Sequence, residues 1–264
     1  MELRELEVDG TASRFRVFGD GPPVVLVHGL SGSWRWWSAV AERLAERRRV
    51  SLLDLPPLRR RFESRQLAGW LGRWLETAGL QNADLVGHSL GGLVAAELAA
   101  ERPELVGRLA LVAPAGIPCG RGLVSRSLPL LETLYDIRAQ FPTVVGDAVR
   151  AGPLGLLRGA AFVSERDLRP ALGGIRAPSL LVWGDRDRLV PTSIAEEWQR
   201  ALPRSRLVLL PCGHVPMWEA PAELAESLLA FLEEEPLDEV ADELRPREVH
   251  GVGLTGDVDE PRSR

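Results

Sequence analysis

The residue best suited to chemistry is a serine inside the pentapeptide GHSLG, residues 87–91, where an apolar stretch meets an alanine-rich one. G-x-S-x-G between a predicted strand and a predicted helix is typical of a sharp turn that holds the serine hydroxyl exposed for nucleophilic attack. Glycine is expected at both ends of the motif because side chains there would collide with the neighbouring strand and helix. The alternative role for Ser89 is a helix N-cap, since serine caps helices well.

A serine nucleophile needs a base to take its proton, and the base needs an acid to orient it. His28 and His88 stand inside glycine motifs beside strand ends, and His250 stands in the polar C-terminal stretch. His214 is the remaining histidine and lies between the last predicted strand and the last predicted helix. Loops of this kind lie at the carboxyl edge of a parallel sheet, where ligands bind, so His214 is the predicted base.

The acid is expected in the loop that follows the apolar stretch LLVWG, where Asp185 and Asp187 are available. The chain order serine, acid, histidine is the order that accompanies a G-x-S-x-G turn at the edge of an α/β sheet. We favour Asp187, because the turn needs room to bend back toward His214, and Asp185 is then a turn residue. The preceding strand, which ends at residues 111–116, offers no carboxylate.

The oxyanion of an acyl-transfer reaction needs hydrogen-bond donors, which are usually two backbone N–H groups. Leu90 follows the serine and supplies the first. The second is expected from Leu30 in HGLSG, where glycine lets the backbone approach closely after the first parallel strand. His28 in that loop is interpreted as a residue that stabilises the turn by hydrogen bonding, and a second base is the alternative.

The elements that must position these residues are short apolar runs that alternate with helical patterns. The runs are apolar without alternation, as in strands covered on both faces, and lie at residues 23–29, 49–56, 83–89, 108–116, 179–185 and 206–214. Helical patterns lie at residues 38–47, 67–77, 92–101, 191–202 and 221–234. This alternation predicts an α/β fold with an open, mostly parallel, doubly wound sheet and right-handed crossovers.

Residues 117–163 break the alternation, because they contain helical segments but no convincing strand. We predict a helical cap inserted into a core of residues 1–116 and 164–234; a long surface excursion without a role is the alternative. Residues 235–264 are acidic, poor in large apolar side chains and interrupted by Pro and Gly, so they are predicted to form a disordered tail.

Composition narrows the class of protein. The 264 residues are 45% hydrophobic and 26% charged with a net charge of −5, so no basic surface for nucleic acid or anionic lipid is expected. Two cysteines are too few for a disulfide framework, and no Cys/His cluster suggests a metal. The chain has neither a secretory signal pattern nor an apolar run near the roughly 18 residues that span a bilayer, so a cytoplasmic location is expected.

Four motifs occur together in one order: VVLVHGLSGS, DLVGHSLGG, LLVWGDRDRLVP and CGHVPMWEAP. In this the chain resembles the α/β-hydrolase superfamily from about Val24 to Leu232. The resemblance implies a serine hydrolase with a helical cap, without cofactor or metal. It implies nucleophile, acid and base at Ser89, Asp187 and His214, and an oxyanion hole at the amides of Leu30 and Leu90. One departure is PLRRRFES after LLDLP, where the family often has a glycine-rich turn.

The resemblance leaves several reactions open, since one fold carries many chemistries. We predict cleavage of carboxylic esters with short to medium, uncharged acyl groups through an acyl-enzyme, by a monomer or homodimer acting on small molecules. The alternatives are a C–C bond hydrolase of aromatic ring-cleavage products, a thioesterase, lactonase or perhydrolase, and a non-catalytic ligand-binding protein. The substrate pocket is predicted to involve Trp34, His88, Tyr135, Phe141 and Val215.

Overall fold

The computed structural model describes residues 1–56, 64–119, 127–202 and 204–234. These belong to one compact unit, Met1–Glu234, with which the following description is concerned. The PLRRRFES segment, apart from its last residue, and the predicted disordered tail lie outside the described residues.

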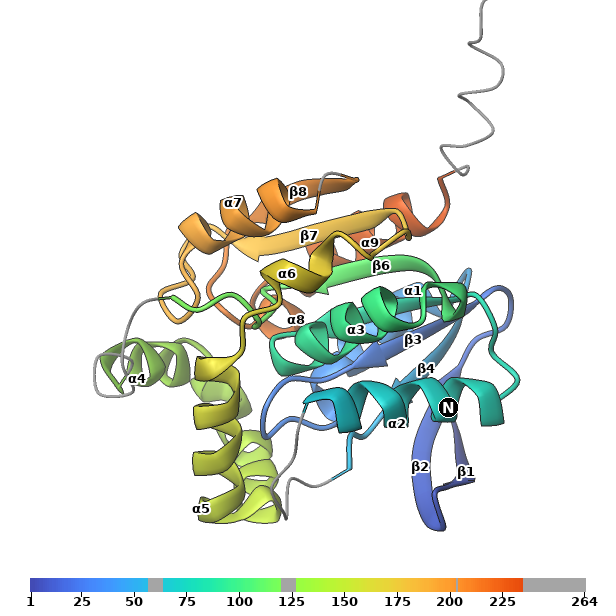
Figure 1. Ribbon diagram of the computed structural model, residues 1–264. Helices are drawn as coiled ribbons and strands as arrows, with labels where there is room; N and C mark the ends of the chain where they lie inside the picture. The colour runs from blue at the N-terminus through green and yellow to red at the C-terminus, as the bar shows by residue number, and fades with distance from the viewer. Residues whose placement is uncertain (57–63, 120–126, 203, 235–264) are drawn as a thin grey trace, which may run out of the picture. The chain divides into compact units, whose positions relative to one another are not determined.

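An eight-stranded sheet forms the centre of this unit (Figure 1). Its order is β1-β2-β4-β3-β5-β6-β7-β8, and all pairs from β4 to β8 are parallel. The strands are β1 Glu2–Val8, β2 Thr11–Phe18, β3 Pro23–Val27, β4 Arg49–Leu53, β5 Ala83–His88, β6 Val106–Val112, β7 Ser179–Gly184 and β8 Ser205–Leu210. The six predicted strands are β3 to β8, which confirms the mostly parallel α/β sheet.

The antiparallel hairpin of β1 and β2 was not predicted from the sequence. Its turn is formed by Asp9 and Gly10, which both have positive φ, at 54° and 69°. Two such residues suit the twist of a two-residue hairpin loop, and Asp-Gly is a strong signal for it. In β2 the buried residues Ser13, Phe15 and Val17 alternate with more exposed ones. This hairpin extends the sheet by pairing β2 antiparallel to β4.

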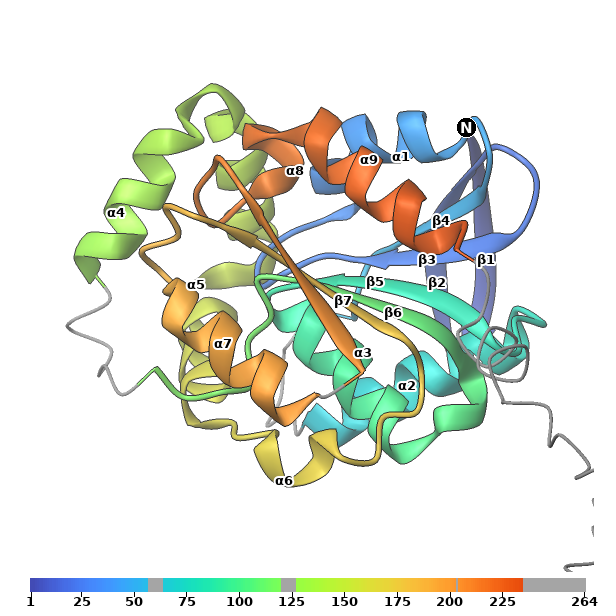
Figure 2. The same cartoon turned by 90° about the horizontal axis from the view of Figure 1, so that it is seen from above.

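Helices cover both faces of the sheet (Figure 2). One face carries α2 Ser64–Thr77, α3 Leu90–Glu101, α6 Arg169–Leu172 and α7 Thr192–Ala201. The other carries the short helix η1 Trp34–Trp37, with α1 Ser38–Leu44, α8 Pro216–Glu219 and α9 Pro221–Leu232. Each face has its own cluster of buried apolar side chains. The doubly wound arrangement is therefore confirmed, and burial on both faces explains why the strands lack alternation.

The interval between β6 and β7 holds α4 Ser127–Asp136, η4 Arg138–Gln140 and α5 Phe141–Glu165, and no strand occurs in its described part. Both long helices lie beyond the carboxyl ends of the parallel strands (Figure 1). Inside α5, Gly152 is non-helical with φ 71°, and Pro153 follows it. Proline cannot donate to the preceding turn, so the pair splits α5 by a kink. No described helix is long and apolar enough to cross a membrane.

Candidate active site

Ser89 occupies a strained turn between β5 and α3. Its φ of 50° and ψ of −114° lie outside the regions that non-glycine residues favour. Three backbone hydrogen bonds hold it there: its N–H donates to the carbonyl of Val112, and its own carbonyl accepts from Leu93 and Ala115, each at 3.0 Å. The Ser89 hydroxyl makes no capping bond to α3, so the N-cap alternative does not account for this serine.

The flanking glycines are explained by the closeness of the backbone. A Cβ atom on Gly87 would lie 2.5 Å from the carbonyl oxygen of Gly91. A Cβ atom on Gly91 would lie 2.5 Å from the carbonyl oxygens of both Val27 and His28. Because these neighbours are main-chain atoms of α3 and of the end of β3, they cannot move aside as a flexible side chain could. The motif therefore packs the serine turn directly onto the loop that follows β3.

His214 and Asp187 form a buried pair. The Nδ1 atom of His214 lies 2.7 Å from Oδ2 of Asp187, and both residues are 5% exposed. The other carboxylate oxygen accepts the N–H groups of Leu189 and Val190, at 2.9 and 2.8 Å. A carboxylate can only accept, so neutral His214 carries its proton on Nδ1 and leaves Nε2 free to take one. Asp185, by contrast, has a half-exposed side chain directed at Arg186.

Ser89, Asp187 and His214 follow β5, β7 and β8, and the carboxyl ends of these parallel strands meet at one sheet edge. The rings of His88 and His214 are 5.0 Å apart between centroids, so the predicted base lies beside the residue that precedes the serine. No hydrogen bond joins the Ser89 hydroxyl to His214 in the described structure. In enzymes without substrate such bonds are often long, and they tighten in the substrate complex.

The two predicted oxyanion donors lie close to the serine. Leu90 is the first residue of α3, where a backbone N–H has no partner within the helix. The loop after β3 packs against the turn, since a Cβ atom on Gly29 would lie 3.2 Å from Cβ of Ser89. Leu30 follows that glycine and lines the same cavity as Leu90. Both predicted donors therefore lie in segments that border the serine turn.

His28 stabilises the loop that carries Leu30. Its Nε2 accepts the N–H of Leu55 at 3.0 Å, which leaves the proton on Nδ1 to be donated to the carbonyl of Gly29 at 2.8 Å. Burial lowers the pKa of His28, which keeps the ring neutral. This is the hydrogen-bonding role interpreted from the sequence.

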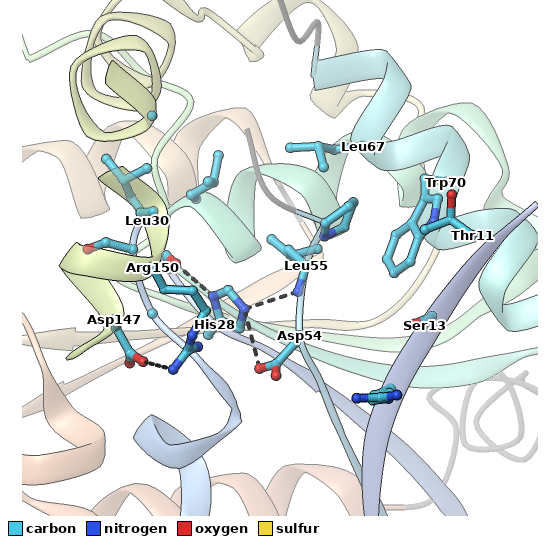
Figure 3. Close-up of a pocket in the computed structure, with 18 of the residues that line it drawn as sticks. Thr11, Ser13, His28, Leu30, Asp54, Leu55, Leu67, Trp70, Asp147 and Arg150 are labelled. Carbon is cyan, nitrogen blue, oxygen red and sulfur yellow. Dashed lines mark hydrogen bonds and ion pairs between the residues drawn. The ribbon is translucent and has the colours of Figure 1, made fainter. Parts of the chain in front are cut away.

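A cavity of about 420 Å³ opens beside the oxyanion loop (Figure 3). Its walls come from β2, from the loops after β3 and β4, and from helices α2 and α5. The apolar part includes Leu30, Leu55, Leu67, Trp70 and Leu90. The charged residues from α5 are Asp147 and Arg150, which pair with each other at 2.8 Å (Figure 3).

Asp147 fastens α5 to the core. Its side chain is buried, and Oδ2 accepts hydrogen bonds from the Ser33 hydroxyl at 2.9 Å and from Nε1 of Trp36 at 3.0 Å. Both donors lie just after the oxyanion loop. Nothing in the sequence marked Asp147, because the docking face of an inserted helix depends on tertiary contacts.

The five residues predicted for the substrate pocket lie outside this cavity. His88 and Val215 are buried. The guanidinium carbon of Arg16 lies 3.8 Å from the centroid of the Trp34 ring. Tyr135 and Phe141 are 67% and 53% exposed. None of the five lines the cavity described above, whose walls include α2 and β2 instead. Ser89 and His214 do not line this cavity either, so the contribution of these five residues to substrate binding stays a prediction.

The buried histidines predict how stability depends on pH. Burial lowers the pKa of His28 and holds that of His88 well below its usual range. Below about pH 6.5 the unfolded chain therefore binds protons that the folded protein does not, so the free energy of unfolding falls as pH falls. Each histidine contributes a slope of at most about 1.4 kcal/mol per pH unit. Urea unfolding between pH 7.5 and 5.5 measures this slope. We expect His88→Gln to reduce it, because glutamine takes up no proton. An unchanged slope in the variant would contradict the view that His88 contributes to it.

Residues 24–227 match the profile of the Alpha/beta hydrolase family. The pimeloyl-[acyl-carrier protein] methyl ester esterase of Aeromonas hydrophila is 30% identical over 250 residues, covering 81% of this chain and 97% of the relative. A dihydrolipoyllysine-residue acetyltransferase component of an acetoin cleaving system, from Pseudomonas putida, is 30% identical over 262 residues, covering 87% of this chain and 69% of the relative. The chain spans only 59% of a protein of that name from Cupriavidus necator.

Among solved structures, a membrane phospholipase A described as a bacterial virulence factor has a TM-score of 0.75 and 29% identity, over 88% of this chain and 86% of that one. The family match takes in the loop after β3, the serine turn and the loop of His214. Together with the doubly wound sheet, it shows that the chain belongs to the Alpha/beta hydrolase family and has esterases among its relatives.

Proposed function

We propose that this protein hydrolyses carboxylic esters of short to medium acyl chains through an acyl-enzyme formed on Ser89. The observation that carries the proposal is the buried Asp187–His214 pair at the same sheet edge as the strained serine turn. An exposed hydroxyl needs such a base beside it to become a nucleophile. The esterase relatives support ester chemistry, and we take residues 117–163 as the cap over this site.

The proposed reaction follows from where protons and charge can go. His214 accepts the Ser89 proton on Nε2 while the serine oxygen attacks the ester carbonyl. The N–H groups of Leu30 and Leu90 stabilise the resulting oxyanion, and Asp187 stabilises the imidazolium. The tetrahedral intermediate expels the alcohol, which takes the proton from His214. Water, activated by the same base, then releases the acid and restores the serine.

The cavity supports an uncharged, apolar substrate of limited size. Arg150 would otherwise place a positive charge on the wall, but its partner Asp147 neutralises it. Four leucines and Trp70 supply the large apolar side chains of the remaining wall, which also includes Arg14 and Asp54. Such a surface binds an acyl chain by burial of apolar area, and it discriminates each added methylene by only about 1–3 kcal/mol.

A panel of p-nitrophenyl esters from acetate to palmitate tests the proposal. We expect kcat/KM to rise through short to medium chains and to gain nothing further for palmitate, because methylenes that extend beyond the cavity of about 420 Å³ stay in water. Neighbouring chain lengths should differ little. The control is a ring-cleavage dienoate, the substrate type of a C–C bond hydrolase. Fast dienoate turnover with feeble ester cleavage would replace the proposal, and no turnover of either would favour a ligand-binding protein.

A further inference from the structure

The backbone around His214 is held by side chains that do not belong to the proposed triad. The N–H of Gly213 donates to Oε2 of Glu219 at 2.7 Å, and the N–H of Val215 donates to Oε1 at 3.0 Å. The carbonyl of His214 itself accepts from Nε2 of His88 at 2.9 Å. One carboxylate thus bridges the two amides on either side of the base, and a neighbouring imidazole holds the carbonyl between them.

We propose that Glu219 is a positioning residue that fixes the catalytic base by clamping these two flanking amides. The inference rests on the proposed function, since it assigns a role in the same reaction. Glu219 touches neither the cavity described above nor the ring of His214, so it acts only through the loop backbone.

The short helix α8 directs the carboxylate to this place. Glu219 is its last residue, and its own N–H donates to the carbonyl of Val215 at 3.1 Å. The side chain therefore folds back over the turn that begins at His214. Gly213 leaves room for it, because a Cβ atom there would lie 2.9 Å from Oε2 and 3.1 Å from Oε1 of Glu219. The glycine before the histidine is thus explained by the clamp.

The clamp matters because the bond to Asp187 fixes one ring nitrogen but not the position of the loop. The Asp187–His214 bond joins two segments that follow different strands, and a displaced loop would carry Nε2 away from the serine. Catalysis is sensitive to displacements of about 1 Å, which cost on the order of 10²-fold in rate. With both flanking amides bound to one carboxylate, the loop has less freedom to shift along or across the sheet edge.

His88 extends the same network toward the nucleophile. It immediately precedes Ser89, is 1% exposed, and donates Nε2–H to the carbonyl of His214. Burial keeps its pKa well below the usual range, so the ring stays neutral with its proton on Nε2. The residue before the serine and the residue predicted as base are therefore joined directly, although 126 positions separate them.

The test compares Glu219→Gln with Glu223→Gln, an exposed glutamate on α9 that serves as the matched control. Glutamine preserves size and one acceptor oxygen but turns an NH₂ group toward the second amide. We expect Glu219→Gln to lower kcat by about 10- to 100-fold with KM within about twofold, in keeping with the cost of a displacement near 1 Å. Fluorophosphonate labelling of Ser89 should slow in parallel, while Glu223→Gln behaves as wild type.

Gly213→Ala is the second variant, because its methyl group would push the Glu219 carboxylate away without removing its charge. We expect the same loss of kcat with little change in KM, even if Glu219→Gln proves hard to fold. Wild-type kcat in either well-folded variant would overturn the clamp. A wild-type enzyme that neither cleaves esters nor reacts with the probe would instead overturn the proposed function.

Discussion

Ser89→Ala is expected to lower kcat for ester hydrolysis by about 10⁴- to 10⁶-fold, the scale seen when a triad member is removed. The reason is that the serine turn brings one hydroxyl beside both proposed oxyanion donors, and alanine leaves no oxygen to attack the ester. Substrate binding should change little, because the methylene of the side chain and the backbone turn remain. Steady-state kinetics on the best ester of the panel gives both quantities.

A fluorophosphonate probe provides an independent readout of the same prediction. Wild-type protein should be labelled and Ser89→Ala should not. Ser227→Ala, which removes a partly exposed serine of α9, is the matched control and should be labelled at the wild-type rate. Labelling that survives in Ser89→Ala would place the nucleophile elsewhere.

Asp187→Asn is expected to lower kcat by about 10⁴-fold, the magnitude known for the equivalent change in a serine–histidine–aspartate triad. Asparagine can still accept the N–H groups of Leu189 and Val190 through its oxygen. It must then present its NH₂ group to Nδ1 of His214. That favours the tautomer with the proton on Nε2, which cannot take a proton from Ser89.

Asp185→Asn is the matched control, two residues away in the same loop. Its carboxylate is half exposed and is directed at Arg186, so its loss should leave kcat within about twofold of wild type. The ratio of kcat values between the two variants is the measurement. A larger loss for Asp185→Asn than for Asp187→Asn would transfer the role of acid to Asp185.

The central sheet was predictable because strands buried on both faces are continuous apolar runs, such as those of β5 and β7. The hairpin of β1 and β2 was missed although its Asp9-Gly10 turn was visible in the sequence. Its strands are rich in charged residues and their outer positions are exposed, so they lack the apolar runs by which the other strands were found. The sequence therefore showed the turn residues of this hairpin but no apolar runs that would have identified its strands.

The candidate site likewise has one part that could be predicted from the sequence and one part that could not. The serine turn and the Asp187–His214 pair follow strand ends, where chain order and local motif suffice to bring residues to one edge. The cavity walls depend instead on how α2, α5 and β2 pack around the loops after β3 and β4. Local sequence patterns do not predict this packing. Asp147 and Glu219 belong to this second kind, since each is recognised only by the donors that surround it in the folded chain.

The order of the strands has a consequence for how the chain assembles during synthesis. β2 pairs with β4, so the N-terminal hairpin can close early but has no place in the sheet until residues 49–53 have been made. The backbone of Ser89 is held by Val112 and Ala115, which emerge later still. Long-range pairings of this kind form slowly because the intervening chain must close first. The strained turn is thus set only after β6 exists. The loop that holds the predicted base is made later still, so the nascent chain could not have assembled the proposed site before then.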